Sequence, residues 1–176
     1  MRKHKILLTL ISVLVLTGII ITASAIAGGK QPDIHSGKTE NLIADRISYT
    51  LRNTDFVIKK TSAEAEKYTL TLFLEVKKTQ GDFYGVLDSF TLSGIEYDSI
   101  VFTDLTEKGE AKIPSSLLLT ATDGEPDTFR WQLDVNLTLS EKAVYTAAAR
   151  LQYTAGTSEA SAMTKIAEIP VTITVE

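Results

Sequence analysis

The amino-acid sequence predicts an all-β fold, an antiparallel β-sandwich of about seven to nine strands preceded by an N-terminal hydrophobic helix. Long stretches of the chain alternate between apolar and polar residues, as half-buried strands do. Short clusters of Gly, Asp, Ser and Pro separate these stretches, and no long amphipathic helix lies between them. The 176-residue chain has no cysteine, so the hydrophobic core must stabilise the domain without disulfides.

The clearest strand signals are three segments in which every second residue is apolar. They are Phe129–Leu139, Tyr68–Lys77 and Ile169–Glu176. Phe73 is the exception to the alternation in the second segment, and Pro170 predicts an edge or a bulge near the start of the third. Rougher alternation predicts further strands at Ile43–Leu51, Asp55–Lys60, Val86–Leu92, Ile95–Phe102 and Ser116–Ala121.

Residues 140–153 fit two structures. Ser140 can cap a helix, and the alanines that follow are good helix formers. The same residues also alternate between larger apolar and polar side chains from Tyr145 to Tyr153. Because the surrounding sequence is β-rich throughout, we predict a strand here.

Leu139 lies six residues before Tyr145. This arrangement resembles the tyrosine corner of immunoglobulin- and fibronectin-III-type sandwiches, where a tyrosine hydroxyl bonds back to the chain as one strand crosses to the next. The resemblance covers about fifteen residues. It implies an immunoglobulin/fibronectin-III-like architecture and names no family.

Residues 1–27 are predicted to be a signal peptide or a membrane anchor. Basic residues at positions 2, 3 and 5 precede an uncharged, mostly apolar run. Small residues around Ala25 and Ala27 offer two cleavage sites. The run is also long enough to span a bilayer core of about 30 Å. Either outcome places the remaining chain outside the cytoplasm, anchored with its N-terminus inside or secreted after cleavage.

Two further segments follow. Residues 28–41 contain three glycines, a proline and scattered charges, and they are predicted to be a flexible linker. Residues 42–176 are predicted to form one extracytoplasmic β-sandwich domain, which is long enough to bury about two thirds of its unfolded surface.

Composition excludes several classes of function. Without the three N-terminal cations, the 18 basic residues become 15 against 22 acidic ones, a net charge of −7. Such a domain repels nucleic acid, which is therefore not an expected partner. The two histidines, His4 and His35, lie before residue 42, so we expect no histidine-based triad, no zinc site and no cofactor in the domain.

Acidic residues offer two weaker alternatives. Asp82, Asp88, Glu96, Asp98 and Asp104 are spread over a few turns and could supply the carboxylate pair of an acid-only hydrolase. The segment Asp123–Asp127 places three carboxylates in one turn, as calcium ligands often are. Both patterns are also typical of a solvated acidic sandwich, and we favour that interpretation and predict no metal site.

The candidate binding residues are Asp82, Phe83 and Tyr84, which lie between Gly81 and Gly85. Two aromatic side chains at a loop tip could stack on a sugar or anchor a partner, although they could equally belong to the next strand and pack on the core. The leading hypothesis is an exported, membrane-tethered module with a non-catalytic binding or structural role at the cell surface. Its expected partners are envelope proteins or glycans, and the alternative is a carbohydrate- or small-ligand-binding module that uses this aromatic loop.

Overall fold

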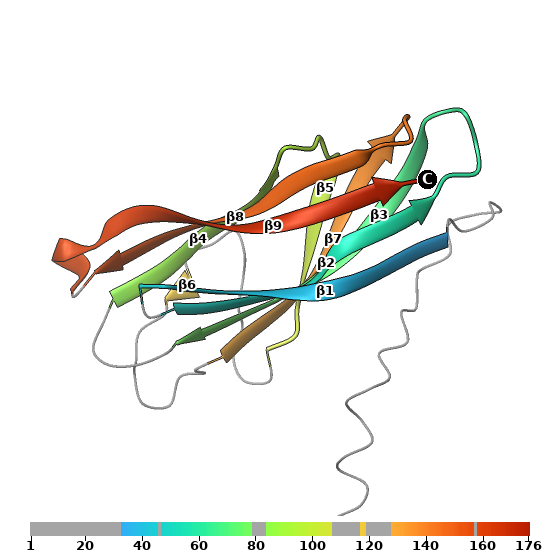
Figure 1. Ribbon diagram of the computed structural model, residues 1–176. Coiled ribbons are helices and arrows are strands. Elements are labelled where there is room, and N and C mark those ends of the chain that lie inside the picture. The colour runs from blue at the N-terminus through green and yellow to red at the C-terminus, as the bar shows by residue number, and fades with distance from the viewer. Residues whose placement is uncertain (1–32, 46, 79–83, 107–116, 119–127, 157) are drawn as a thin grey trace, which may run out of the picture. The chain divides into compact units, whose positions relative to one another are not determined.

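The computed structural model of the protein describes residues 33–45, 47–78, 84–106, 117–118, 128–156 and 158–176. Nearly all of these residues lie in strands, which confirms the predicted all-β class, and one short 3-10 helix, η1 (Glu159–Ser161), precedes the last strand. The strands in Figure 1 are β1 (Asp33–Ala44), β2 (Ile47–Lys59), β3 (Glu66–Lys78), β4 (Tyr84–Ser93), β5 (Ser99–Asp104), β6 (Leu117–Leu118), β7 (Thr128–Leu139), β8 (Val144–Gly156) and β9 (Met163–Val175).

The described strands form one curled, mixed sheet in the order β5-β7-β3-β2-β9-β8-β4-β6, and β1 pairs with β2 (Figure 1). β2 belongs to both halves of this sheet. Its residues Ile47–Arg52 pair antiparallel with β3, and its residues Asp55–Ile58 pair parallel with β9. This parallel pair corrects the prediction of a wholly antiparallel sheet. Alternation does not encode which strands pair. Here the second half of β2, an early strand, pairs with β9, the last strand.

β2 changes its partner at Asn53. This residue has a φ of 63°, in the left-handed region that asparagine tolerates better than most residues. In the matching part of β1, Lys38 has a φ of 59°, and the β1–β2 register shifts between Gly37 and Thr39. The Asn53 side-chain amide donates a hydrogen bond to the carbonyl oxygen of Thr71 at 3.1 Å. The side chain therefore links β2 to β3 beyond the last register pair of these strands.

The break also changes which residues of β2 face the core. The buried residues are Ile47, Tyr49 and Leu51 before it and Thr54, Phe56 and Ile58 after it. The buried positions are thus odd-numbered before the break and even-numbered after it. For this reason the alternation predicts two strands, Ile43–Leu51 and Asp55–Lys60. In the structure, residues 47–51 and 55–59 belong to the single strand β2, whereas Ile43 and Ala44 are the end of β1.

The curl of the sheet encloses one hydrophobic core. The rings of Phe90 in β4 and Phe102 in β5 meet edge to face with their centroids 6.3 Å apart, although these strands lie near opposite ends of the sheet order. Tyr49 of β2 and Tyr153 of β8 come within 6.0 Å, centroid to centroid. Trp131, the one tryptophan of the chain, is 1% exposed. Side chains from both halves of the sheet therefore share one interior.

The strongest strand predictions are confirmed. The three segments with the clearest alternation coincide with β7, β3 and the second half of β9, and residues 144–153 belong to β8, as the strand alternative predicts. Pro170 lies on β9 before its parallel pairing with β2 begins at Thr172. At that position β9 pairs only with β8 among the described residues, which is the edge environment that proline tolerates.

Tyr145 stands at the start of β8. Its hydroxyl donates a hydrogen bond to the carbonyl oxygen of Glu141 at 3.4 Å, and its ring packs against the core. The bond spans the corner between β7 and β8. It is the contact that the resemblance to a tyrosine corner implies.

The structure places the start of the strand domain earlier than residue 42. Residues 33–41, which belong to the predicted linker, lie in β1. Only Ile34, Leu42 and Ala44 of β1 pack against the core, so the strand is held mainly by its backbone pairing with β2. An edge strand of this kind needs little apolar alternation, which explains why residues 33–41 carry no strand signal.

The hydrophobic segment and the first part of the linker lie outside the described residues. Within the residues that are described, no helix is both long and apolar enough to cross a membrane. The chain enters and leaves the described domain at the same end. Asp33 is the register partner of Lys59, and the Glu176 amide donates to the carbonyl oxygen of Ile58 at 2.9 Å.

We expect Asn53→Ala to lower the free energy of unfolding by about 2 kcal/mol, because it removes a hydrogen bond and strains a left-handed backbone. Asn53→Gly removes only the hydrogen bond and should cost about 1 kcal/mol. Urea denaturation followed by the fluorescence of Trp131 measures both values. Equal losses in the two variants would contradict a role for the backbone conformation.

Candidate functional site

The candidate site is an outward surface of the sheet that we call the polar face. It comprises the outward side chains of residues 39–41, 48–52, 69–75, 99–103 and 130–136. Strand alternation points these side chains away from the core. The pairing register then sets outward residues of neighbouring strands side by side. Most of them carry hydroxyl, amide or charged groups.

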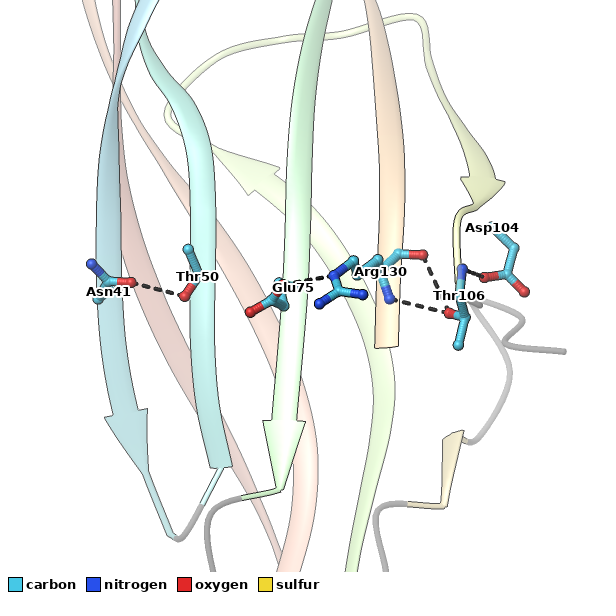
Figure 2. Close-up of polar contacts among 6 residues, drawn as sticks. All are labelled: Asn41, Thr50, Glu75, Asp104, Thr106 and Arg130. Atoms are coloured by element: carbon cyan, nitrogen blue, oxygen red, sulfur yellow. Dashed lines mark hydrogen bonds and ion pairs between the residues drawn. The ribbon is translucent and has the colours of Figure 1, made fainter. Parts of the chain in front are cut away.

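One row of polar side chains crosses four strands of this face, as Figure 2 shows. Asn41, Thr50, Glu75 and Arg130 are successive register partners on β1, β2, β3 and β7. The Thr50 hydroxyl donates to the Asn41 side-chain oxygen at 2.8 Å, and the Arg130 Nε donates to the Glu75 carboxylate at 2.7 Å. Each side chain is thus oriented by a neighbour on the adjoining strand.

The row continues beyond the end of β5. The Leu105 amide donates to the Arg130 carbonyl oxygen at 2.8 Å, and the Arg130 amide donates to the Thr106 hydroxyl at 3.1 Å. Asp104 accepts the Thr106 amide at 2.8 Å (Figure 2). Beyond the last residue of β5, the Leu105 amide and the Thr106 hydroxyl therefore bind the backbone of β7, and Asp104 positions Thr106.

Two further rows are also hydrogen-bonded between strands. The Thr71 hydroxyl of β3 donates to the Asp134 carboxylate of β7 at 2.7 Å. The Thr69 hydroxyl donates to the Asn136 side-chain oxygen at 2.7 Å, and the Asn136 amide donates to the Ser99 hydroxyl of β5 at 3.1 Å. Most polar groups at the centre of the face are therefore held in position by hydrogen bonds between strands.

Phe73 lies among these rows. Its neighbours Leu72 and Leu74 are buried in the core at 1% exposure each, so Phe73 points to the polar face, where it is partly exposed. Its register partners are Arg52 on β2 and Gln132 on β7. Sequence reasoning did not assign a role to Phe73. The available signal was its break in the alternation of a strongly predicted strand.

Of the three predicted loop residues, the structure describes only the backbone of Tyr84. Asp82 and Phe83 lie outside the described residues, as does the acidic turn Asp123–Asp127. Tyr84 is the first residue of β4, where its backbone is paired with Gly156. The binding role of these three loop residues stays a prediction.

Three of the acidic candidates are hydrogen-bonded to separate neighbours. Asp88 accepts from the Thr154 hydroxyl at 3.0 Å, and Asp98 accepts from the Thr138 hydroxyl at 3.2 Å. Asp104 holds the Thr106 amide, as described above. Within the part of the chain that the structure describes, no three His, Asp or Glu side chains are grouped so that they could hold a metal ion.

His35 was expected in the linker, but it lies on β1. Its Nε2 is 3.1 Å from a carboxylate oxygen of Asp33, and the two side chains are 67% and 54% exposed. Solvent screens an ion pair at such positions. The pair therefore lacks the buried setting in which a histidine and a carboxylate usually do chemistry.

A second cluster of titratable groups lies at the turn between β1 and β2. The Asp45 carboxylate accepts hydrogen bonds from the Tyr153 hydroxyl at 2.6 Å and from the Lys165 ammonium at 2.7 Å. The Tyr49 ring lies beside that of Tyr153, and the buried Tyr49 hydroxyl has no hydrogen-bond partner among the residues that the structure describes. The cluster joins the β1–β2 turn to β8 and β9.

The electrostatics of this cluster indicate a structural role. The hydrogen bonds from Lys165 and Tyr153 lower the pKa of Asp45. Burial raises the pKa of Tyr49 and of Tyr153 well above that of an ordinary phenol, and the Asp45 carboxylate adds to the shift. Both phenols therefore stay protonated at neutral pH, so neither is an activated nucleophile or base.

Comparison of the chain with models of protein families, with curated proteins and with solved structures gave no significant match.

The two tyrosines of the cluster should respond in opposite ways to removal of their hydroxyls. Tyr49→Phe removes an unpaired buried group and should raise the free energy of unfolding by about 1 kcal/mol. Tyr153→Phe removes a hydrogen bond to a charged partner and should lower it by about 1–2 kcal/mol. Urea denaturation followed by Trp131 fluorescence gives both values. A loss of stability in Tyr49→Phe would show that its hydroxyl has a partner.

Acid titration should reveal the lowered pKa of Asp45. Because the folded-state pKa lies below the unfolded value, the contribution to stability is complete above about pH 4 and is lost as the pH falls through the folded pKa. Asp45→Asn should therefore make the free energy of unfolding less dependent on pH below about pH 4. Asp55→Asn, at an exposed aspartate outside the cluster, is the control. A slope unchanged by Asp45→Asn would contradict the linkage.

Proposed function

We propose that the protein is an exported, non-catalytic binding module of the cell surface, built as an immunoglobulin-like sandwich and tethered by its N-terminal hydrophobic segment. The strand order supports this architecture. In chain order β2, β3, β4, β5, β7, β8 and β9 can be matched to strands A to G of an immunoglobulin constant-type domain. The two halves of the curled sheet, β5-β7-β3-β2 and β9-β8-β4, would then correspond to its A-B-E-D and C-F-G sheets. Tyr145 then occupies the start of strand F, where the tyrosine corner belongs.

The observation that carries the binding role is the polar face. Five strands contribute to it, and its side chains are hydrogen-bonded across the strands in at least three rows. Groups that are already oriented lose little conformational entropy when a ligand binds. Cross-strand pairs of this kind also stabilise ordinary sheets. Here they hold side chains of three successive rows in fixed positions, which supports a surface that is preorganised for recognition.

Export supports the same role. The basic start and the long apolar run of residues 1–27 are typical of a segment that is inserted into a membrane. A domain outside the cell that is held by one apolar segment is well placed to contact envelope components. Cleavage of that segment would instead release the same module as a secreted protein.

A second candidate uses the connection between β3 and β4, where Asp82 and Phe83 lie. β3 ends at Lys78, the register partner of Ile47 beside the β1–β2 turn, at the end of the domain opposite Asp33. In the assignment above, this connection is the B–C loop, which contacts ligand in antibody variable domains. The aromatic loop with Tyr84 is therefore the alternative site for a carbohydrate or small ligand.

Two arginine substitutions on the polar face should weaken binding to the native envelope. Thr50→Arg combined with Thr71→Arg places bulky cations over the hydrogen-bonded rows, and we expect affinity to fall by about tenfold or more. Sedimentation of the full chain in detergent with membrane-free envelope material measures it. The matched control is Thr146→Arg with Thr172→Arg, two register partners on the outward side of β8 and β9.

The outcomes separate the two sites. Loss in the polar-face variant alone supports the proposal. Equal binding by both variants and the parent would move the site away from the polar face, and loss on substitution of Phe83 and Tyr84 by alanine would then favour the loop. A parent protein that fails to bind any envelope fraction would overturn the binding role itself.

A further inference from the structure

We infer that the polar face binds a neutral, extended polysaccharide and that Phe73 is the residue on which a sugar ring stacks. This inference rests on the proposed function and names the ligand class of the same surface. It begins from the position of Phe73. β3 lies between β2 and β7 in the sheet order, so its outward residues are flanked by strands on both sides.

The surroundings of Phe73 are polar in every direction along the face. Arg52 and Gln132 lie opposite it on the two adjoining strands, and Thr71 and Glu75 precede and follow it on β3. Three of these four side chains are anchored. Thr71 donates to Asp134 at 2.7 Å, Gln132 donates to both oxygens of Asp134 at 3.0 and 3.1 Å, and Glu75 accepts from Arg130.

This arrangement matches the chemistry of a pyranose. A sugar ring has a face of C–H groups and a rim of hydroxyls, so it needs an aromatic ring beneath it and hydrogen-bonding groups around that ring. Carboxylate, amide and guanidinium groups at fixed positions meet the second need. Strands lie about 4.8 Å apart, a spacing close to the length of one pyranose unit. An extended chain that crosses the strands would therefore present a new sugar to each one.

The charge of the face favours a neutral glycan. Its charged outward residues are Arg52 and Arg130 against Glu75 and Asp134, so the charges balance. Arg130 is in addition paired with Glu75 at 2.7 Å. A face of balanced charge offers an anionic polysaccharide no net attraction, and such a polymer would also approach a domain of net charge −7.

Other macromolecules fit this surface less well. A protein partner normally meets a patch whose centre is depleted of charge and rich in aromatic residues. Here one aromatic ring stands among charged and amide groups. A protein ligand is therefore the competing outcome of the test rather than part of the inference.

The test compares Phe73→Ala with Phe73→Tyr in the full chain, held in a detergent without a sugar headgroup. Affinity electrophoresis through gels that contain soluble β-glucan, β-mannan or polygalacturonate measures binding. We expect the parent to bind at least one of the two neutral polymers, and Phe73→Ala to lose about tenfold or more of that affinity. Phe73→Tyr, which keeps the ring, should stay within about threefold of the parent.

Controls keep the result interpretable. Phe73 does not belong to the buried core, so the urea midpoint reported by Trp131 should change little in either variant; if Phe73→Ala does unfold, Phe73→Leu replaces it. No binding of either neutral polymer by the parent, or unchanged binding by Phe73→Ala, overturns the inference. Preference for polygalacturonate overturns it as well. If the parent still binds envelope material after its polysaccharide has been digested, the proposed function stands and only the ligand class fails.

Discussion

The break in β2 at Asn53 is the constraint on which the rest of the structure depends. A strand that stayed extended would keep one set of partners and leave β9 without its parallel neighbour. The left-handed residue turns the strand, and the Asn53 amide keeps it attached to β3 as the two halves of the sheet separate. The change from odd to even buried positions then directs apolar side chains of both halves into one core.

The same break determines how far the polar face, the proposed binding surface, extends. Because the first half of β2 stays with β3, the outward residues of β1 and β2 extend the face that β3, β7 and β5 present. The core supports this face from beneath through Leu72 and Leu74, both buried. Recognition residues on paired strands with a packed layer behind them are held more firmly than residues on loops.

Strands could be predicted from the sequence where burial determines the residue pattern. β3, β7 and the end of β9 each bury one face and expose the other, so their alternation of apolar and polar residues predicts them. Sequence reasoning did not detect β1, whose pairing depends on backbone groups that every residue carries, or the parallel contact of β2 with β9, which joins distant segments. The polar face could not be predicted from the sequence for a related reason. Thr71 and Asp134 can be identified as a hydrogen-bonded pair only when the register that places them opposite each other is known.

β1 has a mechanical consequence in a tethered protein. A ligand held by the polar face would pull the domain away from the membrane, and the tension would reach the domain at Asp33, the first residue of β1. Pulled along its own axis, β1 would have to slide against β2, with which it shares eleven register pairs from Asp33 to Ala44. The hydrogen bonds between these paired residues would have to break together and not one after another. If the proposed tether is retained, this edge strand with few core contacts would therefore be a strong attachment point for the domain.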